Sequence, residues 1–135
     1  MTSYDFWSIL VAAIVAFAIG SLWYSPLLFG KEWMALSGIS TSDASSTKGM
    51  WKLYVAQFIT TLVTFSVIAF ILSTVSGKTA GDGAFLGFIA WLGFPAMAAI
   101  GEMLWTKKPV KLVFIGLACT LITWVIGGAI IGGWN

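Results

Sequence analysis

Four long apolar runs occupy most of this chain, and they constrain its fold more than any other feature. They cover residues 6–24, 53–75, 84–105 and 112–134. A helix needs roughly 20 mostly apolar residues to cross the hydrocarbon of a bilayer, where the backbone has no water to bond to. The runs are continuous, which excludes the alternating pattern of a transmembrane barrel. The sequence therefore predicts an all-α polytopic membrane protein, with four transmembrane helices arranged as two hairpins.

Composition supports the same class. Of the 135 residues, 59% are hydrophobic and only 9% are charged, which is outside the usual range of soluble domains. The longest polar stretch, residues 38–49, is too short to bury a core of its own. We therefore expect a single transmembrane domain over residues 1–135, surrounded by the lipid bilayer.

Lysine placement predicts how the chain is oriented, because basic residues near helix ends are retained on the cytoplasmic side. Lys78 alone lies in the second connection, whereas the other six lysines fall in or beside the first and third connections: Lys31, Lys48, Lys52, Lys107, Lys108 and Lys111. Both termini should then be external.

The dipeptide Ser25-Pro26 after the first run is typical of a helix start. It predicts a short interfacial helix on the cytoplasmic side, ending at Gly38.

One stretch of the sequence resembles a known family. The run from Gly20 to Met34, GSLWYSPLLFGKEWM, resembles the N-terminal signature of a bacterial membrane family known as domain of unknown function 1761 (DUF1761). The segment Trp91-Leu92-Gly93-Phe94 and the Gly-rich stretch from Gly127 to Trp134 are similar to it as well. The resemblance implies a compact four-helix protein of the bacterial cytoplasmic (inner) membrane. It implies no activity and no catalytic residues.

Several chemistries are excluded by missing residue types. The chain has no histidine, its basic residues are all lysine, and Cys119 is its single cysteine. A His-ligated haem, a His-based zinc site and an intramolecular disulfide therefore cannot form. We expect no cofactor, no metal, no nucleic-acid partner and no enzymatic activity.

Glu102 is the most informative polar residue within the predicted spans. A carboxylate near the hydrocarbon is costly and is usually kept for an ion or proton pathway, or is paired with a base. Depth along the helices places five further polar side chains near it, in a layer close to the cytoplasmic boundary: Gln57, Tyr24, Ser21, Thr60 and Thr61. The alternative is structural, with Glu102 snorkelling to the interface or pairing with Lys31, Lys52 or Lys107.

Small residues and one proline predict how the helices meet. Ala12, Ala16 and Gly20 recur every fourth position, and Gly128 and Gly132 form a GxxxG motif. Such stripes let helices approach closely, within one chain or between copies. Pro95 lies in the middle of the third run, where it should kink the helix and provide either a hinge or only packing geometry.

Two function classes fit these features. The first is a homo-oligomeric channel or transporter for a small ion or solute, with a dimer favoured and Glu102 and Gln57 near the pathway. The second is a non-enzymatic module for membrane packing, lipid binding or partner binding, in which the same residues hold helices together.

Overall fold

The computed structural model describes residues 6–24, 28, 31, 35, 50–75 and 79–134. These residues form helices and no strand, and four helical stretches are long and apolar enough to cross a membrane. The predicted all-α fold with four spanning helices is therefore confirmed. The elements are α1 (Phe6–Trp23), α4 (Met50–Thr74), α5 (Ala80–Trp91), the π-helix η1 (Leu92–Ala96), α6 (Met97–Trp105) and α7 (Val110–Gly132).

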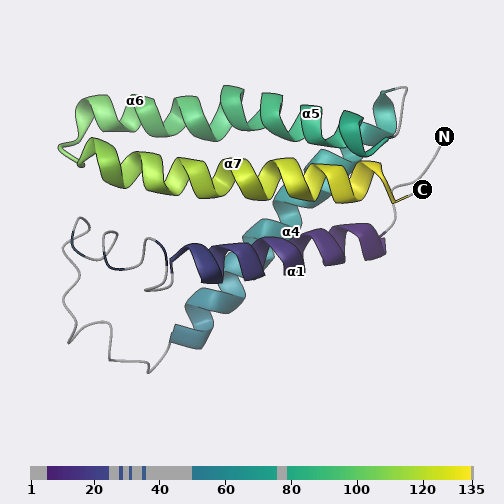
Figure 1. Ribbon diagram of the computed structural model, residues 1–135, viewed down its shortest axis with the longest axis horizontal. Coiled ribbons are helices and arrows are strands. Elements are labelled where there is room, and N and C mark those ends of the chain that lie inside the picture. Colours follow the sequence, from purple (N-terminus) through teal and green to yellow (C-terminus); the bar gives the residue numbers. More distant parts are fainter. Residues whose placement is uncertain are drawn as a thin grey trace.

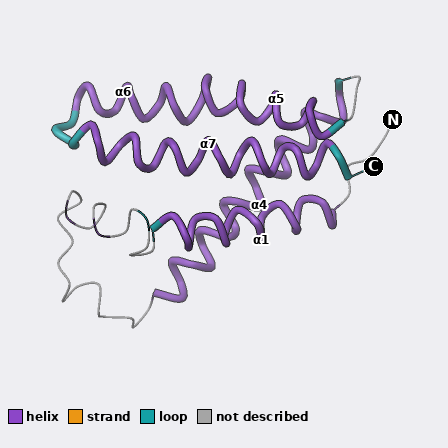
Figure 2. The backbone as a smooth tube through the Cα atoms, in the orientation of Figure 1, coloured by secondary structure: helices purple, strands orange, loops and turns teal. Residues whose placement is uncertain are grey.

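Three spans run alongside one another and the fourth crosses them (Figure 1, Figure 2). The stretch α5–η1–α6 forms one span, α7 runs back beside it, and α1 lies on the other side of α7. The helix α4 crosses this layer obliquely, and α7 contacts all the other spans. Because α1 and α4 cross steeply, the arrangement as two hairpins stays a prediction. The predicted interfacial helix falls mostly on residues outside the described ranges.

Side chains near the two ends of the third span form hydrogen bonds with its terminal backbone groups. At its start, the Thr79 hydroxyl accepts a hydrogen bond from the Asp82 N–H, and the Asp82 carboxylate accepts one from the Thr79 N–H, each at 3.1 Å. This capping box starts α5 at Ala80, four residues before the expected start at Ala84. At the other end, the N–H and the hydroxyl of Thr106 both donate to the carbonyl oxygen of Glu102.

The third span accommodates Pro95 with a π-helical turn, η1. Proline has no N–H to donate and crowds the preceding turn of an α-helix. In membrane helices, a local change to the wider i→i+5 pattern of a π-helix can satisfy the backbone groups that a proline frees. The span continues through η1 into α6 (Figure 1).

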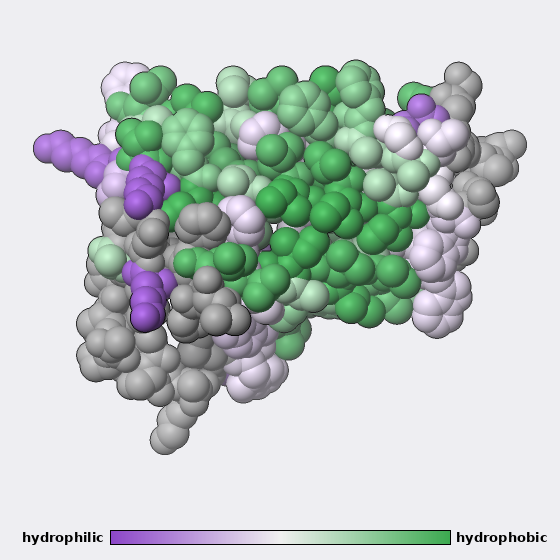
Figure 3. Space-filling view, viewed as in Figure 1, coloured by the Kyte–Doolittle hydropathy of each residue, from purple (hydrophilic) through white to green (hydrophobic). Residues whose placement is uncertain are grey.

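The core lies where α1, α4 and α7 meet. Its members are Ile9, Ala12, Ala13, Ala16, Phe65, Ile68, Ala69, Leu72 and Ile131. Phe65 is the largest fully buried side chain of this cluster. Around the core, Figure 3 shows a broad hydrophobic band across the visible face, with hydrophilic residues at its two ends. This distribution suits a bilayer, because hydrocarbon surrounds the band and water meets the ends.

Candidate functional site

Helices α5 and α7 approach each other closely along a seam formed by two pairs of glycines. A Cβ on Gly83 would overlap the carbonyl oxygen of Gly128, and a Cβ on Gly128 would overlap that of Gly83. A Cβ on Gly132 would lie 3.0 Å from the Cα of Gly83, and one on Gly87 would overlap the carbonyl oxygen of Trp124. The predicted packing residues Gly128 and Gly132 therefore face α5 of the same chain. No space for a ligand remains along this seam.

The other predicted packing residues lie on α1. Ala12 and Ala16 are buried in the core against α4 and α7. A Cβ on Gly20 would meet nothing within 4 Å. The Ala12 and Ala16 positions are thus occupied by contacts within the chain, whereas half-buried Gly20 has free space where a Cβ would lie.

Glu102 lies in the last turn of α6 and forms an ion pair. Its Oε1 accepts a hydrogen bond from the Lys108 Nζ at 3.1 Å, and the side chains of Lys108 and Glu102 are 51% and 59% exposed. The partner differs from the three lysines that the sequence suggested, because the connection after Thr106 folds Lys108 back over the end of α6. An ion pair this exposed contributes at most about 1 kcal/mol.

Gln57, the second residue of the predicted polar layer, lies in the exposed first half of α4. The hydroxyls of Thr60 and Thr61 both donate to its backbone carbonyl, at 2.7 and 2.8 Å. Its own side-chain amide has no hydrogen-bond partner in the described part of the chain. The first turns of α4 lie well apart from α6 (Figure 1), so the segments that carry Gln57 and Glu102 are not brought together.

Tyr24 and Ser21 lie at the end of α1. The Tyr24 hydroxyl approaches α7, where a Cβ on Gly116 would lie 3.6 Å from it. Ser21 is exposed. The Tyr24 hydroxyl is therefore brought to α7, while the Tyr24 side chain as a whole stays 38% exposed.

Two tryptophans make contacts that the sequence did not predict. The indole N–H of Trp23 donates to the carbonyl oxygen of Ile115, and that of Trp91 donates to the carbonyl oxygen of Leu117, both at 3.0 Å. Both acceptors lie on α7, two residues apart, so α1 and α5 are bonded to the same turn of one helix. A backbone carbonyl leaves no signature in a sequence, and only the presence of indoles within spans hinted at such bonds.

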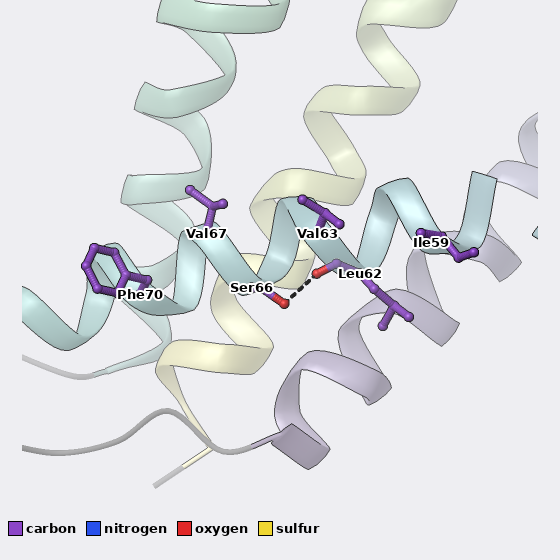
Figure 4. A pocket seen from close by; sticks show the side chains of 6 residues that line it. All are labelled: Ile59, Leu62, Val63, Ser66, Val67 and Phe70. Carbon is purple, nitrogen blue, oxygen red and sulfur yellow. Dashed lines mark hydrogen bonds between the residues drawn. The ribbon is translucent and has the colours of Figure 1, made fainter. Parts of the chain in front are cut away.

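A shallow groove runs along the outer face of α4 (Figure 4). Its lining is Ile59, Leu62, Val63, Ser66, Val67 and Phe70. The Ser66 hydroxyl is the polar group nearest to it and donates to the carbonyl oxygen of Leu62 at 2.7 Å. Because that hydroxyl is already satisfied, the groove offers only apolar contact. In the described ranges, no three His, Cys, Asp or Glu side chains gather to hold a metal.

Comparison with known families gives one match. The sequence model of the family described as "Protein of unknown function (DUF1761)" matches residues 7–132. No curated protein and no solved structure matches the chain. Since the matched stretch covers nearly the whole sequence, the chain belongs to this family.

Proposed function

We propose that this member of the DUF1761 family is a non-enzymatic binding module of the membrane that works as a homodimer through α4. The observation that carries this proposal is the largely exposed first half of α4. The core residues of this helix, Phe65, Ile68 and Leu72 among them, lie in its second half. From Trp51 to Gln57 every side chain is exposed. In this half, the Phe17 ring of α1 packs against Tyr54 and Phe58, and a second copy of the chain would cover the exposed remainder.

The Gln57 amide favours a protein partner over lipid at this face. A primary amide has two donors and an acceptor oxygen, and burying it in hydrocarbon without partners is costly. Polar side chains that face lipid promote association of membrane helices for this reason. In a two-fold dimer, Gln57 in one copy would face Gln57 in the other, and each amide would both donate and accept.

Transport of a small ion or solute is a second candidate, and the π-helix η1 favours it. π-turns are frequent at functional sites, and interrupted helices recur where transporters bind their substrates. The position of Glu102 weighs against this candidate within one chain, because its carboxylate is exposed and held by Lys108. Transport would therefore require a pathway formed between copies.

We also propose that the protein lies in a bacterial cytoplasmic membrane with both termini external. The start of α1 and the end of α7 lie at one end of the molecule, and the connection between α6 and α7 lies at the other (Figure 1). Lys107 and Lys108 belong to that second end. Because lysines are retained in the cytoplasm, this end would face inward.

Dimer formation can be measured by resonance energy transfer between labelled full-length chains in liposomes, as the ratio of protein to lipid is varied. We expect Gln57→Leu to weaken association about three- to tenfold, because hydrogen bonds between membrane helices contribute about 0.6 kcal/mol each. Phe94→Leu, an exposed apolar position of the third span, is the matched control and should leave association unchanged. A protein that stays monomeric at every ratio would contradict the proposal.

The same liposomes distinguish the two candidates. A binding module should show no protein-dependent flux of small cations. Flux through the intact protein that Glu102→Gln abolishes would favour transport instead.

A further inference from the structure

The connection between α6 and α7 concentrates positive charge at one end of the molecule. Helix α6 ends at Trp105 and α7 begins at Val110. Lys107, Lys108 and Lys111 lie on or beside this short connection, and all three are exposed. Figure 3 shows strongly hydrophilic side chains at this end of the visible face. We refer to these three lysines together with Glu102 as the basic rim.

The rim is held in place and keeps an excess of positive charge. The Thr106 N–H and hydroxyl donate to the carbonyl oxygen of Glu102 at 2.9 and 3.0 Å, which fixes the chain as it leaves α6. The Glu102 carboxylate accepts from Lys108 at 3.1 Å. Lys107 and Lys108 against the Glu102 carboxylate leave a net charge of +1 before Lys111 is counted. The ion pair is weak because both groups are half-exposed, so an external anion can compete for Lys108.

Two exposed apolar side chains set the depth of the rim in the bilayer. Leu104 is 75% exposed and Trp105 is 91% exposed, and both lie in the last turn of α6, just before the lysines of the rim. An indole is most favourable where hydrocarbon meets the headgroups, with its ring in the apolar layer and its N–H in water. With Trp105 at that boundary, lysines two, three and six residues later in the sequence extend among the phosphates. Their long stems allow the ammonium groups to reach water.

We propose that the basic rim binds the acidic headgroups of phospholipids in the adjoining leaflet. Lysine ammonium groups near a bilayer surface attract anionic lipids, and the attraction acts within a Debye length. The exposed Leu104 and Trp105 side chains provide contact for the acyl chains of the same lipids. A soluble phosphate would gain the charge contacts alone, and for this reason we assign the rim to lipid.

Electron spin resonance of spin-labelled lipids tests the proposal with the full-length protein in phosphatidylcholine bilayers. The measured quantity is the fraction of labelled phosphatidylglycerol held at the protein surface, relative to labelled phosphatidylcholine. We expect enrichment of the acidic lipid by about twofold or more. K107Q/K108Q should remove most of it. The control K31Q/K52Q removes the same charge from other exposed lysines and should leave most of the enrichment in place.

Glu102→Gln gives a result of opposite sign. The substitution removes the carboxylate that competes for Lys108, so the enrichment of phosphatidylglycerol should rise. Circular dichroism of every variant verifies that the helices are intact, which we expect because the altered side chains are all exposed.

Three results would overturn the proposal. Equal association of the two lipids with the unaltered protein would show that the rim has no preference for acidic headgroups. An equal loss in both double variants would assign the preference to net charge and not to the rim. Displacement of the acidic lipid by inorganic phosphate at constant ionic strength would assign the rim to a soluble anion.

Discussion

Gly83 in α5 and Gly128 in α7 lie backbone against backbone, so that a Cβ on either residue would overlap the carbonyl oxygen of the other. Membrane helices gain little from the hydrophobic effect when they associate, because lipid is as apolar as their side chains. Close approach gains dispersion contacts that lipid cannot supply. The glycine seam is therefore a main source of attraction between the third and fourth spans.

Gly128→Ala should destabilise the fold. The new methyl group meets the backbone of α5, which cannot rotate away as a side chain can, so the two helices must separate. Such overpacking costs about 1 to 3 kcal/mol, which exceeds the ~1 kcal/mol that alanine gains over glycine in helix propensity. The free energy of unfolding, measured by denaturant titration in micelles, should fall by the difference.

Gly101→Ala is the matched control for that substitution. It lies in the same third span as Gly83, and a Cβ there would meet nothing within 4 Å. Its stability should stay the same or rise by up to about 1 kcal/mol. Equal destabilisation by Gly101→Ala and Gly128→Ala would contradict the role assigned to the seam.

Gly127→Ala tests the contact between α7 and the core of α4. Its methyl group would overlap the outer edge of the Phe65 ring, a side chain that is almost fully buried. In a Phe65→Leu background those ring atoms are missing, so the same substitution should cost about 1 kcal/mol less than in the unaltered protein. A double-mutant cycle with no coupling energy would show that Phe65 does not approach Gly127 in the membrane.

Trp91→Phe should remove the bond between α5 and the Leu117 carbonyl while preserving an aromatic ring. The carbonyl oxygen has two lone pairs and keeps its place in the hydrogen-bond ladder of α7. The loss should therefore be modest, about 0.6 kcal/mol of unfolding free energy. Trp105→Phe, at an indole that is almost fully exposed, serves as the comparison in the same titration. An equal effect of the two substitutions would count against the bond.

The four spans could be predicted because crossing the bilayer requires about 20 consecutive, mostly apolar residues, and a pattern of that length is visible in a sequence. Helix ends were less predictable. The Thr79–Asp82 capping box starts α5 at Ala80, so the helix includes Gly81 and Gly83. From the sequence alone, glycines at these positions are typical of a connection between helices. The steep crossing of α4 was not predictable either, because apolar faces of similar character do not specify an angle.

The candidate polar layer was predicted from the depth of each residue along its helix. Residues at the same depth can face different directions around the bundle, so depth alone does not show that they meet. The first turns of α4, which carry Gln57, lie apart from α6, which carries Glu102, while the Tyr24 hydroxyl is brought to α7. The partner of Glu102 depended on the path of the chain after Thr106, which hydrogen bonds to the backbone decide. The sequence does not indicate these bonds, because their acceptors are backbone carbonyl oxygens, which every residue has.

The proposed orientation predicts which ends of the spans an impermeant thiol reagent can reach. A Cys119→Ala background removes the single native thiol, which is buried. Thr106→Cys and Ala80→Cys then place one exposed thiol in the connection between α6 and α7, or at the start of α5. Because the lysines beside Thr106 favour the cytoplasm, an impermeant maleimide should label position 80 in intact cells and leave position 106 unlabelled. Permeabilised cells should label both, which controls for reactivity. Labelling of position 106 from outside would reverse the orientation.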